Sequence, residues 1–206
     1  MSRLHAILDV HVAAAAGWDV APLAAAFLDG GARVIQLRAK GLASRGFLEH
    51  ADELVRAARA HGASIIVNDR VDIAMLSGAS GVHVGQEDLA PAAARRLLGP
   101  GATIGYSTHT IAQIEAAAAE PVSYIAIGPV FGTRTKDTGY DAVGLDLVAE
   151  AARRSRGRPV VAIGGITLER APEVIAAGAS SVAVITDLLT GGDPQARVAA
   201  YLRTLP

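Results

Sequence analysis

Cysteine is absent from this sequence of 206 residues. Its absence excludes disulfide bonds, thiolate nucleophiles and metal sites built on cysteine. Mean hydropathy is +0.34, yet no stretch reaches the roughly 18 to 20 uninterrupted apolar residues that a membrane span requires. The apolar stretch after Arg3 is interrupted by His5, Asp9 and His11, so it does not predict a secretory signal. Together these absences predict a cytoplasmic protein.

An excess of charge is also missing. The chain has 19 basic and 20 acidic residues, for a net charge of −1. We therefore expect neither nucleic acid nor a membrane as a partner, but small molecules bound at a local site. Lysine occurs only at Lys40 and Lys136, and asparagine only at Asn68. The oligomeric state stays open, a homo-oligomer included.

Composition and pattern predict one α/β domain over residues 1–206. With 51% hydrophobic residues, a chain of this size buries about 70% of its unfolded surface. Short runs of Val, Ile and Leu alternate with longer Ala-rich segments, and most runs are continuous, which indicates strands of a parallel sheet buried on both faces. The predicted strands are residues 5–9, 33–37, 64–68, 81–84, 103–107, 124–128, 160–163 and 181–185.

Helical spacing fills the intervals between these strands. Residues 48–60 place apolar side chains on one face, and residues 111–119 follow Thr110, a residue type that caps helices. Glycines that should end helices are Gly30, Gly62, Gly99 and Gly178. Eight such units predict a compact (β/α)8 TIM barrel. An open doubly wound sheet is the alternative, but the first strand lacks the glycine fingerprint that such a sheet carries.

The second predicted strand runs into three polar residues at alternate positions. Gln36, Arg38 and Lys40 point the same way if the chain stays extended. Three converging donors suit a phosphate or diphosphate. A strand end with solvated charges is the alternative.

Two carboxylates follow neighbouring strands. Asp69 ends the third strand and Asp88 follows the fourth, so both lie at the mouth of a barrel, where Mg²⁺ could bind them together with diphosphate oxygens. Asn68 would then donate to the phosphate. Alternatively, Asp69 or Asp88 caps the helix that follows it.

The fifth strand ends in hydroxyl residues and a histidine. Ser107 lies where a helix begins and anions bind well. His109 suits general acid or base work, but a solvated histidine in a first helical turn is at least as consistent with the pattern. His83 falls within an apolar strand, which favours a packed, hydrogen-bonded core residue. The roles of His5 and His11 stay open.

A long segment follows the sixth strand, and glycines follow the seventh. Thr133, Thr135 and Lys136 form a second anion-binding cluster in a loop of a length typical of lids or binding loops. Gly165 and its neighbour, with Thr186 after the eighth strand, resemble the phosphate site of many barrels. The clusters together indicate two phosphorylated substrates, one of them a diphosphate that leaves.

Taken in order, these segments resemble the thiamine-phosphate synthase family over nearly the whole chain. The matching motifs are residues 4–9, 36–40, 68–72, 81–88, 107–109, 128–136, 162–166 and 183–186. The resemblance implies a (β/α)8-barrel transferase that joins 4-amino-5-hydroxymethyl-2-methylpyrimidine diphosphate to a thiazole phosphate, releasing diphosphate with Mg²⁺. It implies a developing methylene cation and no protein nucleophile, which agrees with the absence of cysteine.

The resemblance also implies a role for particular residues. The pyrimidine diphosphate would be held by Gln36, Arg38, Lys40, Asn68, Ser107 and Lys136. Of these, Lys136, Arg38, Lys40 and Ser107 would act in catalysis. Mg²⁺ would be bound by Asp69 and Asp88. The thiazole phosphate would be surrounded by Thr133, Thr135, Gly165, Ile185 and Thr186.

Thiazole tautomerase, a relative that acts on thiazole carboxylate phosphate, shares the barrel and many motifs. Residues 4–7 and 105–109 are similar to that branch. That branch usually places a catalytic histidine where this chain has Pro129, and it tends to lose the patterns at 36–40 and 133–136, which are intact here. The synthase is therefore favoured, with a non-catalytic thiazole-phosphate-binding paralogue as the third alternative. Thr186 replaces a common serine, and residues 139–142 replace prolines, which leaves the conformation of the 137–143 segment open.

Overall fold

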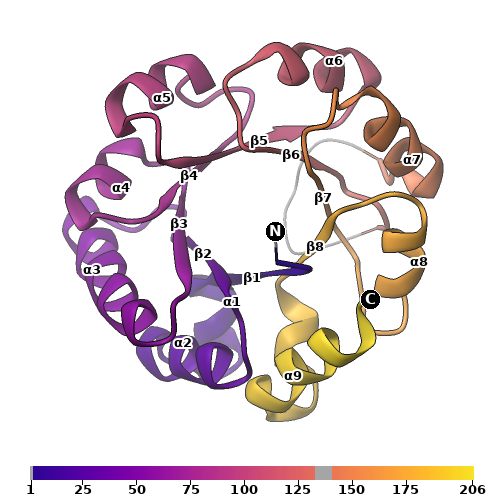
Figure 1. The fold of residues 1–206 in the computed structure, drawn as a ribbon. Coiled ribbons are helices and arrows are strands. Elements are labelled where there is room, and N and C mark those ends of the chain that lie inside the picture. The colour runs from indigo at the N-terminus through magenta and orange to yellow at the C-terminus, as the bar shows by residue number, and fades with distance from the viewer. Residues whose placement is uncertain (1, 133–140) are drawn as a thin grey trace.

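Eight parallel strands close into a barrel in this computed structural model, which describes residues 2–132 and 141–206. Each strand pairs with its neighbours in chain order, and β8 pairs with β1. Figure 1 looks along the barrel, with the helices in a ring outside the strands. The (β/α)8 barrel predicted from the sequence is confirmed. The strands are β1 Leu4–Asp9, β2 Val34–Arg38, β3 Ser64–Asn68, β4 Gly81–Val84, β5 Thr103–Thr108, β6 Tyr124–Ile127, β7 Val160–Ile163 and β8 Ser181–Val184.

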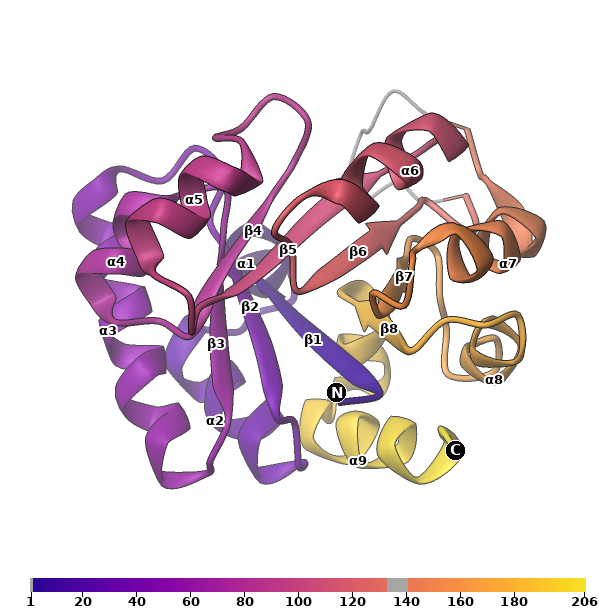
Figure 2. The ribbon, with the colours of Figure 1, turned by 45° about the horizontal axis from the view of Figure 1, so that its top comes forward.

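The helices alternate with the strands, and Figure 2 shows them packed against the outside of the barrel. Thr110 caps α6 as predicted, since its hydroxyl accepts a hydrogen bond from the Gln113 amide at 3.2 Å. The helices are α1 Val10–Ala15, α2 Val20–Asp29, α3 Ser44–Ala60, α4 Val71–Ser77, α5 Pro91–Leu98, α6 Ile111–Ala119, α7 Gly144–Arg154, α8 Ala171–Ala176, the kinked 3₁₀ segment η1 Thr186–Gly192 and α9 Pro194–Thr204. Within the described ranges, no helix is long and apolar enough to cross a membrane.

Alternation along each strand divides the apolar residues between two cores. On β1, Leu4, Ala6 and Leu8 point outward into the main core between strands and helices. Ile7 points inward, into a small second core inside the barrel. On β1, β6, β7 and β8 both faces meet packed apolar side chains, which is why these strands are continuous apolar runs in the sequence. The inner core consists of Ile7, Tyr124, Ala126, Val161 and Ala183, with Ile163 and Ile185 packed against it.

Candidate active site

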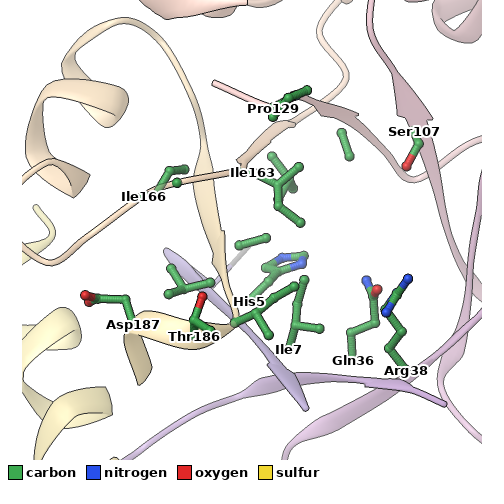
Figure 3. A pocket seen from close by; sticks show the side chains of 18 of the residues that line it. His5, Ile7, Gln36, Arg38, Ser107, Pro129, Ile163, Ile166, Thr186 and Asp187 are labelled. Carbon is green, nitrogen blue, oxygen red and sulfur yellow. The ribbon is translucent and has the colours of Figure 1, made fainter. Parts of the chain in front are cut away.

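A cavity of about 410 Å³ opens inside the barrel above the inner core. Every strand contributes side chains to its lining, and the loops at the carboxyl ends of the strands form its upper wall. This is the end of the barrel at which enzymes of this architecture place their active sites. Figure 3 shows side chains of this lining, with Gln36, Arg38 and Ser107 on one side of the cavity and Thr186 and Asp187 on the other.

Polar side chains line the cavity along β2 to β5. Gln36 and Asn68 are buried, with 5% and 7% of their surfaces exposed. Arg38 forms an ion pair with Asp9, a buried carboxylate that also caps α1. The Arg38 Nε is buried and has no hydrogen-bond partner within the described ranges. A buried donor without a partner is costly, so an anion bound here would satisfy it.

A hydrogen-bonded chain links the strands β4, β5 and β6 inside the barrel. His83 on β4 contacts the Tyr124 hydroxyl through Nδ1 at 2.9 Å and the Ser107 hydroxyl through Nε2 at 2.8 Å. Burial raises the pKa of Tyr124, so its phenol stays protonated. A Cβ on Gly105 would lie 2.1 Å from the Tyr124 ring, so only glycine leaves room for it. His83 is buried and hydrogen-bonded, as predicted, but it also lines the cavity, which was not predicted.

His5 lies at the bottom of the cavity, and its role was left open by the sequence. It is 2% exposed, and burial lowers its pKa to about 4, so the imidazole is neutral near pH 7. Its ring stands edge-on to Tyr124, with 5.2 Å between the ring centroids. Its position on β1 between Leu4 and Ala6, which point outward, is the signal that identifies it as an inward residue.

Two further histidines differ in their relation to the cavity. His109 is partly buried, lines the cavity and contacts the Gly128 carbonyl through Nδ1. The alternative of a solvated histidine in a first helical turn is therefore wrong, because His109 precedes the Thr110 cap and contacts the Gly128 carbonyl after β6. His11 lies outside the lining, with Nε2 2.8 Å from the Lys40 carbonyl oxygen.

The segments after β7 and β8 line the opposite side of the cavity and include two adjacent glycines. Gly164 and Gly165 have φ values of +104° and +63°, in the region that favours glycine. A Cβ on Gly165 would lie 2.7 Å from the Gly132 carbonyl oxygen, and one on Gly164 would lie 2.5 Å from the Pro129 Cα. Ile185 and Thr186 complete this side. The predicted phosphate-site residues of the described segments therefore share one wall.

Several predicted site residues lie at the rim or beyond the described residues. Strand β2 ends at Arg38, and Lys40 is exposed in the following turn and does not line the cavity. The prediction that the chain stays extended to residue 40 is wrong, because Gly41, with a φ of +81°, turns it. Thr133, Thr135 and Lys136 lie outside the described residues.

The two predicted metal ligands also lie at the rim. Asp69 has a φ of +63° and lines a smaller outer hollow beside α4 rather than the main cavity. The Asp88 carboxylate accepts a hydrogen bond from the Gly85 amide at 2.7 Å. Neither residue caps a helix, since Arg70 and Ala90 hold the N-cap positions of α4 and α5. No cluster of three or more His, Cys, Asp or Glu residues suited to a metal occurs within the described ranges.

Fold and site together define a class of protein: a (β/α)8-barrel enzyme with polar groups gathered at the carboxyl ends of its strands. The model of a family described as thiamine monophosphate synthase matches residues 5–188. The chain belongs to this family, which confirms the family and the enzyme class predicted from the sequence.

Individual relatives agree with this assignment. The thiamine-phosphate synthase of Mycobacterium sp. (strain KMS) is 47% identical over 187 residues, covering 86% of this chain and 82% of the relative. That of Koribacter versatilis is 46% identical over 176 residues, covering 85% and 82%. Among solved structures, the thiamine phosphate pyrophosphorylase from Pyrococcus furiosus superposes with a TM-score of 0.88 at 29% identity, covering 98% of this chain and 94% of that one.

Proposed function

We propose that this enzyme joins 4-amino-5-hydroxymethyl-2-methylpyrimidine diphosphate to a thiazole phosphate, forming thiamine phosphate and releasing diphosphate. The observation that carries the proposal is the division of one cavity into a side of polar side chains along β2 to β5 and a side of glycine and backbone after β7 and β8. Two phosphorylated substrates need two anion sites that face one reaction space. Family membership supplies the pyrimidine and thiazole chemistry.

The polar side is proposed to hold the diphosphate substrate. Arg38 and Ser107 would donate to the diphosphate, and Asn68 and Gln36 would contact the substrate deeper in the cavity. The buried, unpartnered Arg38 Nε supports this assignment, because an anionic oxygen would complete its hydrogen bonding. Lys40, at the rim, and Lys136 would add positive charge as the diphosphate departs.

The glycine side is proposed to hold the thiazole phosphate. Gly165, Ile185 and Thr186 would surround the phosphate, with backbone amides and a hydroxyl as donors. Thr133 and Thr135 belong to the same proposed site on the basis of sequence.

Mg²⁺ fits the rim as a shared ion rather than as an ion held by protein alone. Asp69 and Asp88 offer two carboxylates on neighbouring loops, and Mg²⁺ characteristically takes one or two carboxylates and completes its shell with substrate phosphates and water. When bound, the ion would neutralise charge on the diphosphate.

The chemistry requires bond breaking at the pyrimidine methylene and bond formation from the thiazole nitrogen. As the bond between the methylene carbon and the diphosphate oxygen breaks, Arg38 and Ser107 would stabilise the negative charge that collects on the leaving group. The thiazole nitrogen then donates its electron pair to the methylene carbon. The inner core and the neutral His5 would exclude water from the floor of the cavity. The cationic carbon would then react with the thiazole nitrogen rather than with water.

Product analysis tests the proposed function. Purified protein given both substrates and Mg²⁺ should form thiamine phosphate and diphosphate in equal amounts. Tautomerisation of thiazole carboxylate phosphate without thiamine phosphate formation would instead assign the tautomerase activity. Binding of thiazole phosphate without turnover, measured by calorimetry, would assign the non-catalytic alternative.

Variants test the rim in the same assay. Asp69→Ala and Lys136→Ala should each lower turnover at least about tenfold, which corresponds to about 1.4 kcal/mol of transition-state stabilisation. Asp72→Ala is the matched control, since this carboxylate lies nearby on α4 but is exposed and paired with Arg70. Wild-type turnover in Asp69→Ala or Lys136→Ala would remove that residue from the mechanism.

A further inference from the structure

A carboxylate stands beside the proposed thiazole-phosphate site. Asp187 directly follows Thr186 and belongs to the cavity lining, with 13% of its side chain exposed. In Figure 3 its carboxylate points away from the centre of the cavity. A negative charge here would repel a phosphate unless it were neutralised and turned away.

The Asp187 carboxylate is neutralised by a dense set of donors. Arg197 donates through Nη2 to Oδ1 at 3.0 Å and to Oδ2 at 2.8 Å, and through Nε to Oδ2 at 3.1 Å. The Tyr201 hydroxyl donates to Oδ2 at 2.5 Å. Planar, bidentate pairing of this kind fixes geometry as well as charge. Glu169 adds only a longer contact to Arg197, at 3.7 Å.

The same carboxylate reaches a third segment. The Leu168 backbone amide, in the loop between β7 and α8, donates to Asp187 Oδ2 at 3.1 Å. That loop includes Gly164, Gly165 and Thr167, all of which line the cavity. One side chain therefore joins the loop after β7 to the segment after β8 and to helix α9.

Helix α9 carries both side-chain donors to Asp187, Arg197 and Tyr201. Asp193 caps it by accepting a hydrogen bond from the Ala196 amide at 2.9 Å, and Pro194 occupies its first turn. Arg197 and Tyr201 are four residues apart, so they lie on one face of the helix. Tyr201 is fully buried, which anchors that face against the barrel.

We propose that Asp187, with Arg197 and Tyr201, is a positioning group that fixes the two phosphate-binding segments relative to each other. It thereby sets the affinity for the phosphate monoester end of the thiazole substrate without touching the reacting atoms. The inference rests on the proposed function, and it assigns helix α9 a role in substrate affinity.

Substrate-specific binding and kinetics test the inference. Calorimetry with thiazole phosphate and steady-state kinetics with both substrates would be measured for Arg197→Ala, Asp187→Ala/Arg197→Ala and Tyr201→Phe. Arg197→Ala should raise the Kd and KM for thiazole phosphate about tenfold or more, because Asp187 is then an uncompensated charge beside the phosphate. The double variant should recover about threefold of that loss, since it removes the repulsive charge as well.

Tyr201→Phe removes one hydroxyl and keeps the ion pair. It should raise the same Kd about threefold, with the KM for the pyrimidine diphosphate and kcat at saturation within about twofold of wild type. Arg154→Ala is the matched control: this arginine pairs with Glu150 and Glu115 on the outer surface, and its loss should change no kinetic constant.

Three results would overturn the inference: unchanged thiazole-phosphate affinity in folded Arg197→Ala, a double variant no better than Arg197→Ala, or equal changes for both substrates. If Arg197→Ala does not fold, unchanged affinity in Tyr201→Phe overturns it instead. If the wild-type protein binds thiazole phosphate but makes no thiamine phosphate, only the proposed function is contradicted. The inference is still tested in that case, because calorimetry compares the Kd for thiazole phosphate between wild type and the variants.

Discussion

The two sides of the cavity present different polar groups, side chains on one side and exposed backbone at two glycines on the other. Along β2 to β5, side chains such as Gln36, Asn68 and Ser107 project into the space. After β7 and β8, Gly164 and Gly165 expose backbone to the cavity beside the side chains of Ile185 and Thr186. A side-chain site is damaged by losing atoms, whereas a backbone site is damaged by gaining them. Substitutions that remove side-chain atoms should therefore impair the first side, and substitutions that add atoms should impair the second.

The largest effect is expected on the glycine side. Gly165→Ala adds a methyl group 2.7 Å from the Gly132 carbonyl oxygen and strains a φ of +63°. It should lower kcat/KM for thiazole phosphate about a hundredfold, or about 2.7 kcal/mol. Gly157→Ala is the matched control, since Gly157 also has positive φ, +79°, but no neighbour within 4 Å of an added Cβ. Similar losses in both variants would mean that backbone strain, rather than crowding, is responsible.

The next largest effect is expected at His5, beneath both sides of the cavity, and it is an effect on the free energy of unfolding. Burial lowers the pKa of His5 from 6.5 to about 4, so between these values the unfolded chain binds a proton that the folded chain does not. The free energy of unfolding therefore falls as the pH falls through this window. Urea denaturation at pH 7 and pH 5 should show a decrease about 2 kcal/mol larger for wild type than for His5→Phe. Equal decreases in the free energy of unfolding for wild type and His5→Phe would mean that His5 is hydrated in the folded protein.

The smallest effect is expected from the polar side. Arg38→Ala should lower kcat/KM for the diphosphate substrate about tenfold, or about 1.4 kcal/mol, because one of several cationic groups is lost. Asp9→Asn is the comparison: it removes the ion pair with Arg38 but keeps an acceptor for the His11 and Val12 amides. An equal loss of kcat/KM in both variants would mean that the loss comes from breaking the ion pair between Arg38 and Asp9, and not from removing a contact between Arg38 and the substrate.

The fold was predictable because burial on both strand faces leaves a continuous apolar run. All eight strands were predicted within one residue at each end, as with β5, which extends to Thr108 rather than ending at Ser107. Gln36 and Asn68, which were selected as polar residues near the ends of such runs, both line the cavity. Lys40 was misplaced because spacing alone did not reveal the turn at Gly41.

Other parts of the site depend on information that local pattern does not contain. A histidine in an apolar strand can face either core, and His5 and His83 were resolved only by their neighbours Leu4, Ala6, Val82 and Val84, all of which belong to the outer core. The pairing of Asp187 with Arg197 depends on how α9 docks on the barrel, which is a tertiary outcome.

The division of the apolar residues into two cores has a consequence for how this protein can evolve. The outer core and the inner core share no member, although alternate residues of the same strands supply them. Changes at Ala126, Val161 or Ala183 reshape the floor on which a ring would rest, while the helices keep their own contacts with the barrel. Selection can therefore alter ligand preference at inward positions and preserve the scaffold at outward ones, with the strand pleat separating the two tasks.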